Sequence, residues 1–341
     1  MAKKRISYIA GTRNDISLTT QQLIGLDYEL EHHIVKSDGE IIEAIKGTDV
    51  IINESVPMSR AVIEQIDNSK AVISLGHGFN HIDHEAATER GVIIANCAGY
   101  CADEVANHTI MFLLGCSRRL LNMDRLVRSG NWTTQTDRGS LPFAPMGNLD
   151  GEVLGLIGFG NIGRAVARRA VVFGLDVVIY DPFVEPWIVQ DYRARTVTGL
   201  EELGRESDFV SMHVPLNQNT RGLANETLFN AMKPTAYFIN TCRGPTHDEK
   251  TLINALESDK IAGAAIDVFE EEPTPSNNPL LKMDNVILSP HSAGTSDHSY
   301  KAGRVRLGEE TARILRGTLP MSVANPDVIS RIPNRPAARS S

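Results

Sequence analysis

The feature that most restricts the fold of this chain is a group of glycines after the apolar segment Val153–Ile157. Gly158, Gly160 and Gly163 follow that segment in the spacing G-x-G-x-x-G, and the next residues, RAVARRAVVFG, have a helical pattern. The spacing alone is weak evidence because glycine is common. Between a strand and a helix, however, such a turn directs the first amide groups of the helix toward a pyrophosphate, so the pattern predicts a dinucleotide site.

Three glycines and one acid have separate tasks in such a site. Gly158 permits the tight turn, Gly160 lets the backbone approach the phosphates, and Gly163 allows close contact between helix and strand. A second predicted strand, DVVIYD, ends at Asp181. Its carboxylate would accept hydrogen bonds from the adenosine ribose and repel a 2′-phosphate, which favours NAD over NADP. The alternative, a tight turn with a helix-capping aspartate, would not require strand, turn, helix, strand and acid in this order.

The length and composition indicate a globular protein of two domains. A chain of 341 residues exceeds the size at which one hydrophobic core keeps growing. Hydrophobic residues make up 42% and charged residues 22%, which is typical of globular proteins. The net charge of −8 gives no broad attraction to nucleic acid or to anionic membranes. No apolar run approaches the roughly 20 residues that cross a bilayer.

Cysteine usage and the amino terminus favour a reduced, cytoplasmic compartment. The four cysteines, Cys97, Cys101, Cys116 and Cys242, include no C-x-x-C pair, and four in a chain of this length do not indicate a disulfide framework. The apolar run near the amino terminus is too short for a signal peptide.

Short apolar segments alternate with helical patterns, which indicates βαβ units with parallel strands. In the first hundred residues the predicted strands are RISYIA, DVIINES, AVISLG and GVIIANC, and the predicted helices are SRAVIEQI and HEAATERG. From residue 152 onward the predicted strands are EVLGLIG, DVVIYD, FVSMHVP, AYFINT, AGAAIDV and NVILSPH, which suggests a doubly wound sheet. Between them, one long helical pattern from about residue 102 to 129 would either bridge two domains or form a subunit contact. The tail from residue 325, rich in proline and polar residues, is predicted to pack loosely or to be mobile.

Four further segments, together with GFGNIG and YDP, resemble the D-isomer-specific 2-hydroxyacid dehydrogenase family. They are HVPLNQNTRGL, FINTCRGPTHDE, GAAIDVFEEEP and NVILSPHSAG. The resemblance extends from SLGHGFNHIDHEAATERGV to His291, and GYCADEVANHT is most similar to the branch with C-terminal-binding-protein-like members. It implies an α/β protein of two Rossmann-like domains with doubly wound parallel sheets. A discontinuous substrate domain (1–101 and 297–341) would contain an inserted NAD-binding domain (102–296).

The catalytic arginine, glutamate and histidine of the family fall on Arg243, Glu272 and His291. A guanidinium can bind the carboxylate of a 2-keto acid and polarise its carbonyl group. Hydride transfer to that carbonyl leaves an alkoxide that needs a proton, which His291 can donate, and remove in the reverse direction. Glu272 would orient the imidazole and favour its protonated form. Taken singly, Arg243 could be a surface ion-pair partner, Glu272 part of an acidic run and His291 a buried histidine. Their combination and order along the chain favour a catalytic role.

The resemblance also implies the binding residues. The implied cofactor contacts are Thr109, Gly158, Phe159, Gly160, Asn161, Ile162, Gly163, Asp181, Pro182, His213, Val214, Pro215, Thr220, Thr241, Cys242, Asp267 and Gly294. Asp267 would bind the nicotinamide carboxamide, and Cys242 would contribute its backbone, since no activating base is evident beside its thiol. Gly76, His77 and Gly78 resemble a loop whose amides bind the substrate carboxylate. His77 replaces a small residue and would either donate a hydrogen bond to substrate or cofactor or face solvent. No metal site is expected.

Together these features predict an NAD-dependent oxidoreductase that interconverts a small, unphosphorylated 2-keto acid and its D-2-hydroxy acid. Glyoxylate, hydroxypyruvate and pyruvate-like acids are the expected substrates, and a homodimer through the 102–129 helix is the expected assembly. Glu54 stands where members that act on phosphorylated substrates often have a basic residue, so it would repel a phosphate.

Three alternatives are compatible with the same catalytic residues: an NAD(H)-sensing binding protein of the corepressor kind, a phosphoglycerate dehydrogenase and a phosphite-type dehydrogenase. A departure from the family pattern is the run Pro245, Thr246 and His247, where the family tends to be apolar. It leaves the local packing open, but not the position of Arg243.

Overall fold

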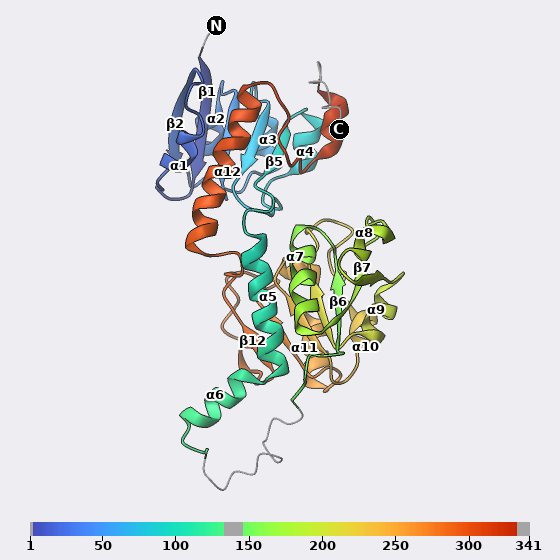
Figure 1. Ribbon diagram of the computed structural model, residues 1–341. Coiled ribbons are helices and arrows are strands. Elements are labelled where there is room, and N and C mark those ends of the chain that lie inside the picture. Colours follow the sequence, from blue (N-terminus) through green and yellow to red (C-terminus); the bar gives the residue numbers. More distant parts are fainter. Residues whose placement is uncertain (1–2, 133–145, 333–341) are drawn as a thin grey trace. The chain divides into compact units, whose positions relative to one another are not determined.

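The computed structural model describes residues 3–132 and 146–332 (Figure 1). The chain forms two compact units. Unit 1 consists of residues up to Cys101 and from Ser296 onward, and unit 2 extends from Ala102 to Thr295. Each unit has its own parallel sheet, of five and seven strands. The prediction of two α/β domains with parallel sheets is therefore confirmed.

Unit 1 is built on a sheet with the strand order β2-β1-β3-β4-β5. Its strands are β1 (Lys4–Ala10), β2 (Tyr28–Ile34), β3 (Val50–Glu54), β4 (Ala71–Ser74) and β5 (Ile93–Asn96). The four strands other than β2 are mostly or wholly buried runs, as expected when helices cover both faces of a parallel sheet.

Two layers of helices cover the two faces of this sheet. On one face, α2 (Asp38–Ile45), α3 (Arg60–Glu64) and α4 (His84–Glu89) share a hydrophobic core with the strands. On the other face, α12 (Asp297–Leu315) packs beside α1 (Ser17–Gln21), as Figure 1 shows. Residues of α12, near the end of the chain, therefore complete the core that the first hundred residues begin.

Unit 2 is built on a sheet with the strand order β12-β11-β10-β9-β6-β7-β8. Its strands are β6 (Val153–Ile157), β7 (Asp176–Tyr180), β8 (Ala194–Thr196), β9 (Phe209–Met212), β10 (Tyr237–Asn240), β11 (Gly263–Ile266) and β12 (Val286–Leu288). The order reverses between β6 and β9, since the chain builds β7 and β8 on one side and then β9 to β12 on the other. Ligands of doubly wound sheets bind at the carboxyl ends of the strands beside such a switch point.

Helices again cover both faces in unit 2. On one face, α5 (Ala102–Ser117), α7 (Asn161–Ala170) and α8 (Pro186–Gln190) share a core with the strands, and Figure 1 shows α5 alongside α7. On the other face lie α9 (Leu200–Glu206), α10 (Glu226–Ala231) and α11 (Glu249–Glu257). Short 3₁₀ turns occupy Val171–Phe173, Gly244–Thr246 and Pro279–Lys282.

The prediction of one long helix over residues 102–129 is wrong, because the structure has two helices there. α5 ends at Ser117, and α6 (Leu120–Arg128) begins after Arg119, which has a left-handed backbone with φ of 50°. The guanidinium of Arg119 lies over the ring of Tyr237, 5.3 Å from its centroid. This tertiary contact accompanies the break between the two helices, and neither glycine nor proline lies between them in the sequence.

Two strands were missing from the prediction, and both are edge strands. β2 alternates between half-buried and exposed residues, and the three residues of β8 include an exposed arginine. Edge strands pack on fewer neighbours, so they need fewer apolar residues and leave a weak pattern.

The predicted loose packing of the tail is wrong for its first eight residues. Pro326–Arg331 form a 3₁₀ turn, and the side chain of Val328 is completely buried. The Asn325 side chain accepts a hydrogen bond from the Ile94 amide and donates to the Val92 carbonyl, so it continues the edge of the sheet at β5. The rest of the tail, residues 333–341, lies outside the described residues.

Candidate active site

The predicted site residues of unit 2 follow the carboxyl ends of its strands. Along the sheet order, His291 follows β12, Asp267 follows β11, Thr241 to Arg243 follow β10, His213 to Pro215 follow β9, Gly158 follows β6 and Asp181 follows β7. Adjacent strands lie about 4.8 Å apart. All these residues therefore share one edge of one sheet, with the predicted catalytic group on one side of the switch point and the glycine turn across it.

The glycine turn has the geometry of a phosphate-binding turn. Gly158 has a φ of 96°, and a β-carbon there would stand 2.6 Å from the carbonyl oxygen of His213. At Gly163 a β-carbon would stand 2.4 Å from the carbonyl oxygen of Gly158, so both positions require glycine. In contrast, a β-carbon at Gly160 would meet nothing within 4 Å.

Open space at Gly160 lies where the helix begins. Gly160 is the N-cap residue of α7, and no side chain caps the first amides of that helix. Uncapped amides beside open space suit an anionic oxygen. The residues present therefore fit the pyrophosphate of a dinucleotide, and Asn161 and Ile162 form the first turn of α7 beside it.

Asp181 connects this turn to the end of β7. One carboxylate oxygen, Oδ2, accepts a hydrogen bond of 2.7 Å from the Phe159 amide, and Oδ1 accepts one of 2.9 Å from the Phe183 amide across Pro182. An ionised carboxylate has about four acceptor positions. Asp181 can therefore hold the turn and still accept bonds from ribose hydroxyls.

The histidine and the glutamate of the predicted catalytic group are in direct contact. The Nδ1 atom of His291 lies 2.6 Å from Oε2 of Glu272, while Oε1 of Glu272 accepts a bond of 3.0 Å from the Phe269 amide. One carboxylate oxygen therefore holds the ring, and the other ties Glu272 to the backbone of its own loop. The His291 side chain is 45% exposed, which leaves its Nε2 edge as the one that can exchange a proton with a ligand.

Arg243 is held through its backbone in the turn after β10. Its carbonyl oxygen accepts hydrogen bonds from Asn240 Nδ2 at 3.1 Å and from Thr246 Oγ1 at 2.6 Å. At Gly244 a β-carbon would stand 1.7 Å from the carbonyl oxygen of Phe269, so the arginine turn rests directly on the loop that leads to Glu272. The three predicted catalytic residues thus lie on loops that contact one another or follow neighbouring strands.

Several predicted cofactor contacts have structural partners inside unit 2. Burial lowers the pKa of His213 to about 3, so its ring is a neutral core group, with Nε2 3.0 Å from Ser211 Oγ. Thr109 and Thr241 are buried, with their hydroxyl oxygens 3.0 Å apart. These groups shape the edge of the sheet, so any contact of His213 with a ligand would come from its backbone.

The remaining predicted contacts are also placed. Thr220 Oγ1 donates to the Pro215 carbonyl and closes the loop that follows Val214. Burial raises the pKa of the Cys242 thiol, which argues against a nucleophilic thiolate. Gly294 lies in the turn closed by the Thr295 amide on the Ser292 carbonyl.

Asp267 has a function that sequence reasoning missed. Its side chain is completely buried and accepts hydrogen bonds from Ser289 Oγ at 2.5 Å and from the amides of Ser292 and Ala293 at 2.8 and 2.9 Å. Asp267 therefore anchors the loop that carries His291. The expected contact with a carboxamide stays a prediction.

The predicted substrate loop belongs to unit 1, where Gly76 follows β4 with a φ of 122°. The ring of His77 is held within this loop region, because its Nδ1 accepts a hydrogen bond of 3.2 Å from the Gly99 amide. Asn96 Nδ2 also donates to the His77 carbonyl oxygen at 2.6 Å. The loop is thus tied to the segment after β5, and the proton of the neutral ring is on Nε2.

Glu54 does not carry the unbalanced charge expected from the sequence. Its carboxylate accepts hydrogen bonds from Tyr8 Oη and from Arg304 Nη2, both at 2.6 Å, and the Glu54 and Arg304 side chains are only 10% and 6% exposed. Because Arg304 matches the negative charge, the repulsion of a phosphate by Glu54 is offset. Glu54 also lines a cavity of about 480 Å³ in unit 1, together with Thr12 and Lys36.

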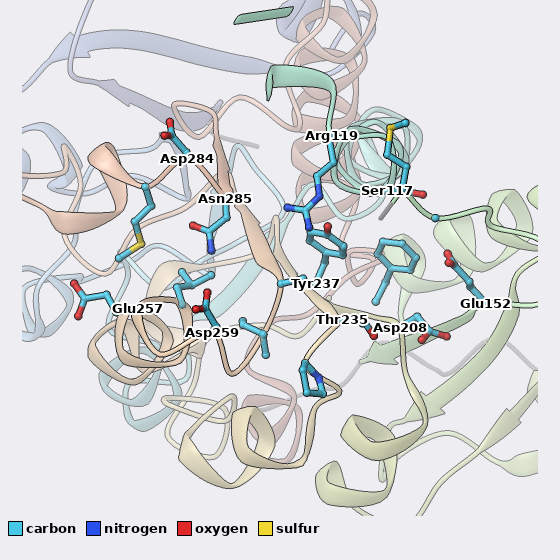
Figure 2. A pocket seen from close by; sticks show the side chains of 18 residues that line it. Ser117, Arg119, Glu152, Asp208, Thr235, Tyr237, Glu257, Asp259, Asp284 and Asn285 are labelled. Atoms are coloured by element: carbon cyan, nitrogen blue, oxygen red, sulfur yellow. The ribbon is translucent and has the colours of Figure 1, made fainter. Parts of the chain in front are cut away.

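A second cavity, of about 810 Å³, lies at the opposite edge of the unit 2 sheet (Figure 2). Glu152, Asp208, Tyr237 and Asn285 line it, each at or just before the amino end of a strand. None of the predicted site residues lines it. Since dinucleotides bind at carboxyl ends, this cavity is not the predicted site.

Within residues 3–132 and 146–332, no cluster of three or more histidine, cysteine or acidic side chains could hold a metal ion. The same described residues contain no helix with the length and hydropathy needed to cross a bilayer.

Comparison with known proteins agrees with this geometry. Residues 110–293 match a family model described as D-isomer specific 2-hydroxyacid dehydrogenase, NAD binding domain. A glyoxylate reductase of Thermofilum pendens is 39% identical over 79% of this chain and 78% of its own length. A D-3-phosphoglycerate dehydrogenase of Methanocaldococcus jannaschii is 36% identical over 84% of this chain, which spans only 53% of that protein. A D-lactate dehydrogenase of Aquifex aeolicus, solved with NAD and lactic acid, superimposes with a TM-score of 0.80 at 25% identity, covering 94% of this chain and 99% of that one.

Proposed function

The chain belongs to the D-isomer specific 2-hydroxyacid dehydrogenase family, and we propose that it reduces a small, unphosphorylated 2-keto acid to the D-2-hydroxy acid. The observation that carries this proposal is the contact of 2.6 Å between His291 Nδ1 and Glu272 Oε2, at the same sheet edge as the glycine turn. Glyoxylate, hydroxypyruvate and pyruvate-like acids are the proposed substrates, because several relatives at 34–39% identity are named glyoxylate reductase.

Residues of unit 2 would hold the cofactor. The amides at the start of α7 would bind the pyrophosphate, and Asp181 would accept bonds from the adenosine ribose. When bound, NADH supplies the hydride for the reduction. Pro182 and Phe183, which follow Asp181, offer no cation to a 2′-phosphate, which supports NAD as the preferred form.

Three side chains would act on the substrate. Arg243 binds the carboxylate of the keto acid and draws electron density from its carbonyl oxygen. His291 donates its Nε2 proton to that oxygen as the carbon is reduced, and removes the proton in the reverse reaction. Glu272 keeps the ring oriented and balances the charge of its protonated form. Gly76 to Gly78, in unit 1, stay the proposed substrate loop, which makes unit 1 the proposed substrate domain.

A phosphorylated keto acid is the second candidate. The pairing of Glu54 with Arg304 supports it, since the charge that would repel a phosphate is offset, and two relatives are named D-3-phosphoglycerate dehydrogenase. An NAD(H)-sensing binding protein is the third, because it would use the same residues without turnover.

One substrate panel separates these functions. NADH oxidation is measured with glyoxylate, hydroxypyruvate, pyruvate and 3-phosphohydroxypyruvate, and NAD reduction is measured with phosphite. Saturable turnover of an unphosphorylated keto acid supports the proposal. A higher kcat/KM for 3-phosphohydroxypyruvate or for phosphite would contradict the proposal and favour the corresponding alternative. Tight NADH binding without any turnover would favour the NAD(H)-sensing binding protein.

Replacing Asp181 with alanine is expected to lower the preference for NADH over NADPH by about tenfold or more. The change removes the acceptor for the ribose hydroxyls and the repulsion of a 2′-phosphate, and tenfold corresponds to about 1.4 kcal/mol. The ratio of kcat/KM with the two cofactors measures the effect. Asp176→Ala, at the exposed amino end of the same strand, should leave that ratio unchanged. A wild type that prefers NADPH would contradict the role of Asp181.

We also propose a homodimer that involves α6. This helix has no buried residue, and Leu120, Val127 and Trp132 are each more than half exposed. Apolar side chains gathered on one segment mark contact surfaces. Sedimentation equilibrium should give twice the chain mass of 37.3 kDa, and Val127→Glu should shift the protein toward the monomer. Val172→Glu, also highly exposed, is the control. A wild type of monomer mass would refute the dimer.

All four cysteines are buried, and the cytoplasmic setting stays a proposal that rests on their small number in a chain of this length.

A further inference from the structure

The backbone of His291 is strained. His291 has a φ of 51°, in the left-handed region that residues other than glycine rarely adopt. A conformation of this kind persists only when the surrounding structure holds it. Here His291 stands between Pro290 and Ser292, so its own neighbours offer no glycine to relieve the turn. The groups that hold the turn must therefore come from elsewhere in the fold.

Asp267 supplies these groups. Its backbone carbonyl oxygen accepts a hydrogen bond of 2.8 Å from the His291 amide. Its carboxylate accepts bonds from the next two amides, those of Ser292 and Ala293. Three consecutive amides of the His291 turn thus bind one residue. Asp267 is completely buried, and an unpaired carboxylate in that position would be costly, so the bonds stabilise the turn and the aspartate together.

A third hydrogen bond to the same carboxylate comes from Ser289. The hydroxyl of Ser289 lies 2.5 Å from Asp267 Oδ1 and 3.0 Å from Nε2 of His108. A serine hydroxyl has one hydrogen, and an ionised carboxylate can only accept. The hydrogen of Ser289 therefore points to Asp267, and His108 must donate its Nε2 hydrogen to the Ser289 oxygen.

His108 is well placed to hold that orientation. It lies on α5, which packs against β11 and β12, and its ring meets the ring of Phe112 edge-on at 4.5 Å. Burial lowers the pKa of His108, although Asp267, 3.9 Å away, opposes that effect. A neutral imidazole with its proton on Nε2 is the form that the contact to Ser289 requires.

We propose that His108 and Ser289 are positioning residues that act through Asp267 to hold the strained turn of His291, so that its ring meets Glu272 in the reactive orientation. This inference rests on the proposed function, in which His291 moves the proton. It deepens that function by assigning two residues outside the catalytic group to the alignment of its acid and base. Neither residue touches the substrate in this scheme. They act only on the geometry of the turn.

The test compares Ser289→Ala with Ser292→Ala. Ser289→Ala removes the hydroxyl between His108 and Asp267, whereas Ser292→Ala removes a hydroxyl from the same turn and keeps the amide that binds Asp267. Ser289→Ala is expected to lower kcat by about 10- to 100-fold, since a misplacement of about 1 Å can cost 10²-fold. The KM for NADH should not change, and the solvent isotope effect on kcat should rise. Ser292→Ala should match the wild type.

Conservative replacements separate positioning from simple loss of folding. Ser289→Thr keeps the hydroxyl and His108→Gln keeps a donor near the Nε2 position, so both should recover most of kcat. His108→Leu should resemble Ser289→Ala although it lies on a different element. Thermal unfolding of each variant shows whether it is folded at the assay temperature.

Hydrogen exchange gives a readout that does not depend on turnover. In the protein without substrate, the amides of residues 291 to 293 should exchange faster in Ser289→Ala and His108→Leu than in the wild type, and at the wild-type rate in Ser292→Ala. If Ser289→Ala equals Ser292→Ala in both exchange and kcat, the proposal is wrong. If the wild type reduces no keto acid, the proposed function fails, and the exchange rates still decide whether Ser289 and His108 hold the turn.

Discussion

Replacing His291 with glutamine is expected to lower kcat for keto-acid reduction by about 10²- to 10⁴-fold, the usual contribution of a general acid or base. Glutamine keeps a polar side chain of similar length, but it cannot donate a proton to a developing alkoxide. The dinucleotide would bind through the glycine turn and Asp181, which this change does not touch, so the affinity for NADH should be unchanged. Steady-state kinetics and a fluorescence titration with NADH measure the two effects.

A matched histidine provides the control for this variant. His84 belongs to unit 1, at the start of α4, and is not one of the predicted site residues. His84→Gln should keep the wild-type kcat. A His291→Gln protein that retains full kcat would show that another group donates the proton, and the proposed mechanism would have to be abandoned.

Replacing Arg243 with alanine should produce the second large loss, about 10²- to 10⁴-fold in kcat/KM for the keto acid. Two hydrogen bonds between a guanidinium and a carboxylate, at about 1.5–3 kcal/mol each, account for that range. KM should rise because carboxylate binding is lost, and kcat should fall because the carbonyl is no longer polarised. Arg243→Lys should recover only part of the activity, since an ammonium group cannot form the paired contact.

Arg205→Ala is the control for the arginine variants. Arg205 is exposed on α9, where it pairs with Glu201 at 3.7 Å, and pairs of this kind contribute little to stability. It should keep the wild-type kcat/KM and the wild-type unfolding temperature. If Arg243→Ala changed neither KM nor kcat, the substrate carboxylate would have to bind to another group.

Much of the fold could be predicted because each buried strand has a local signature. The apolar runs of β1, β3 to β7 and β9 to β12 are short and bounded by polar or turn residues, and parallel strands covered on both faces require such runs. The edge strands β2 and β8 were not predicted, because polar residues suffice where one side of a strand faces solvent. The break between α5 and α6 was not predicted, because it accompanies the contact of Arg119 with Tyr237, which no pattern of neighbouring residues encodes.

The family and the NAD-binding domain were predicted from motifs, and both are confirmed by the match over residues 110–293. Arg243, Glu272 and His291 could be selected because each lies in a recognisable segment. The roles of the individual residues stay predictions. The charge argument built on Glu54 did not hold, because its partner Arg304 is 250 residues away in the sequence.

The sequence by itself determined the local elements: a glycine turn between a strand and a helix, an acid at the end of the next strand, and polar residues after buried strands. These depend on backbone conformation and on residues close together in the chain. Only the tertiary structure decided that three loops would share one edge of a sheet, that Asp267 would hold the turn of His291, and that Gly244 would rest on the backbone of Phe269. Such contacts join residues that are distant along the chain, and their energy exists only when the whole sheet has formed.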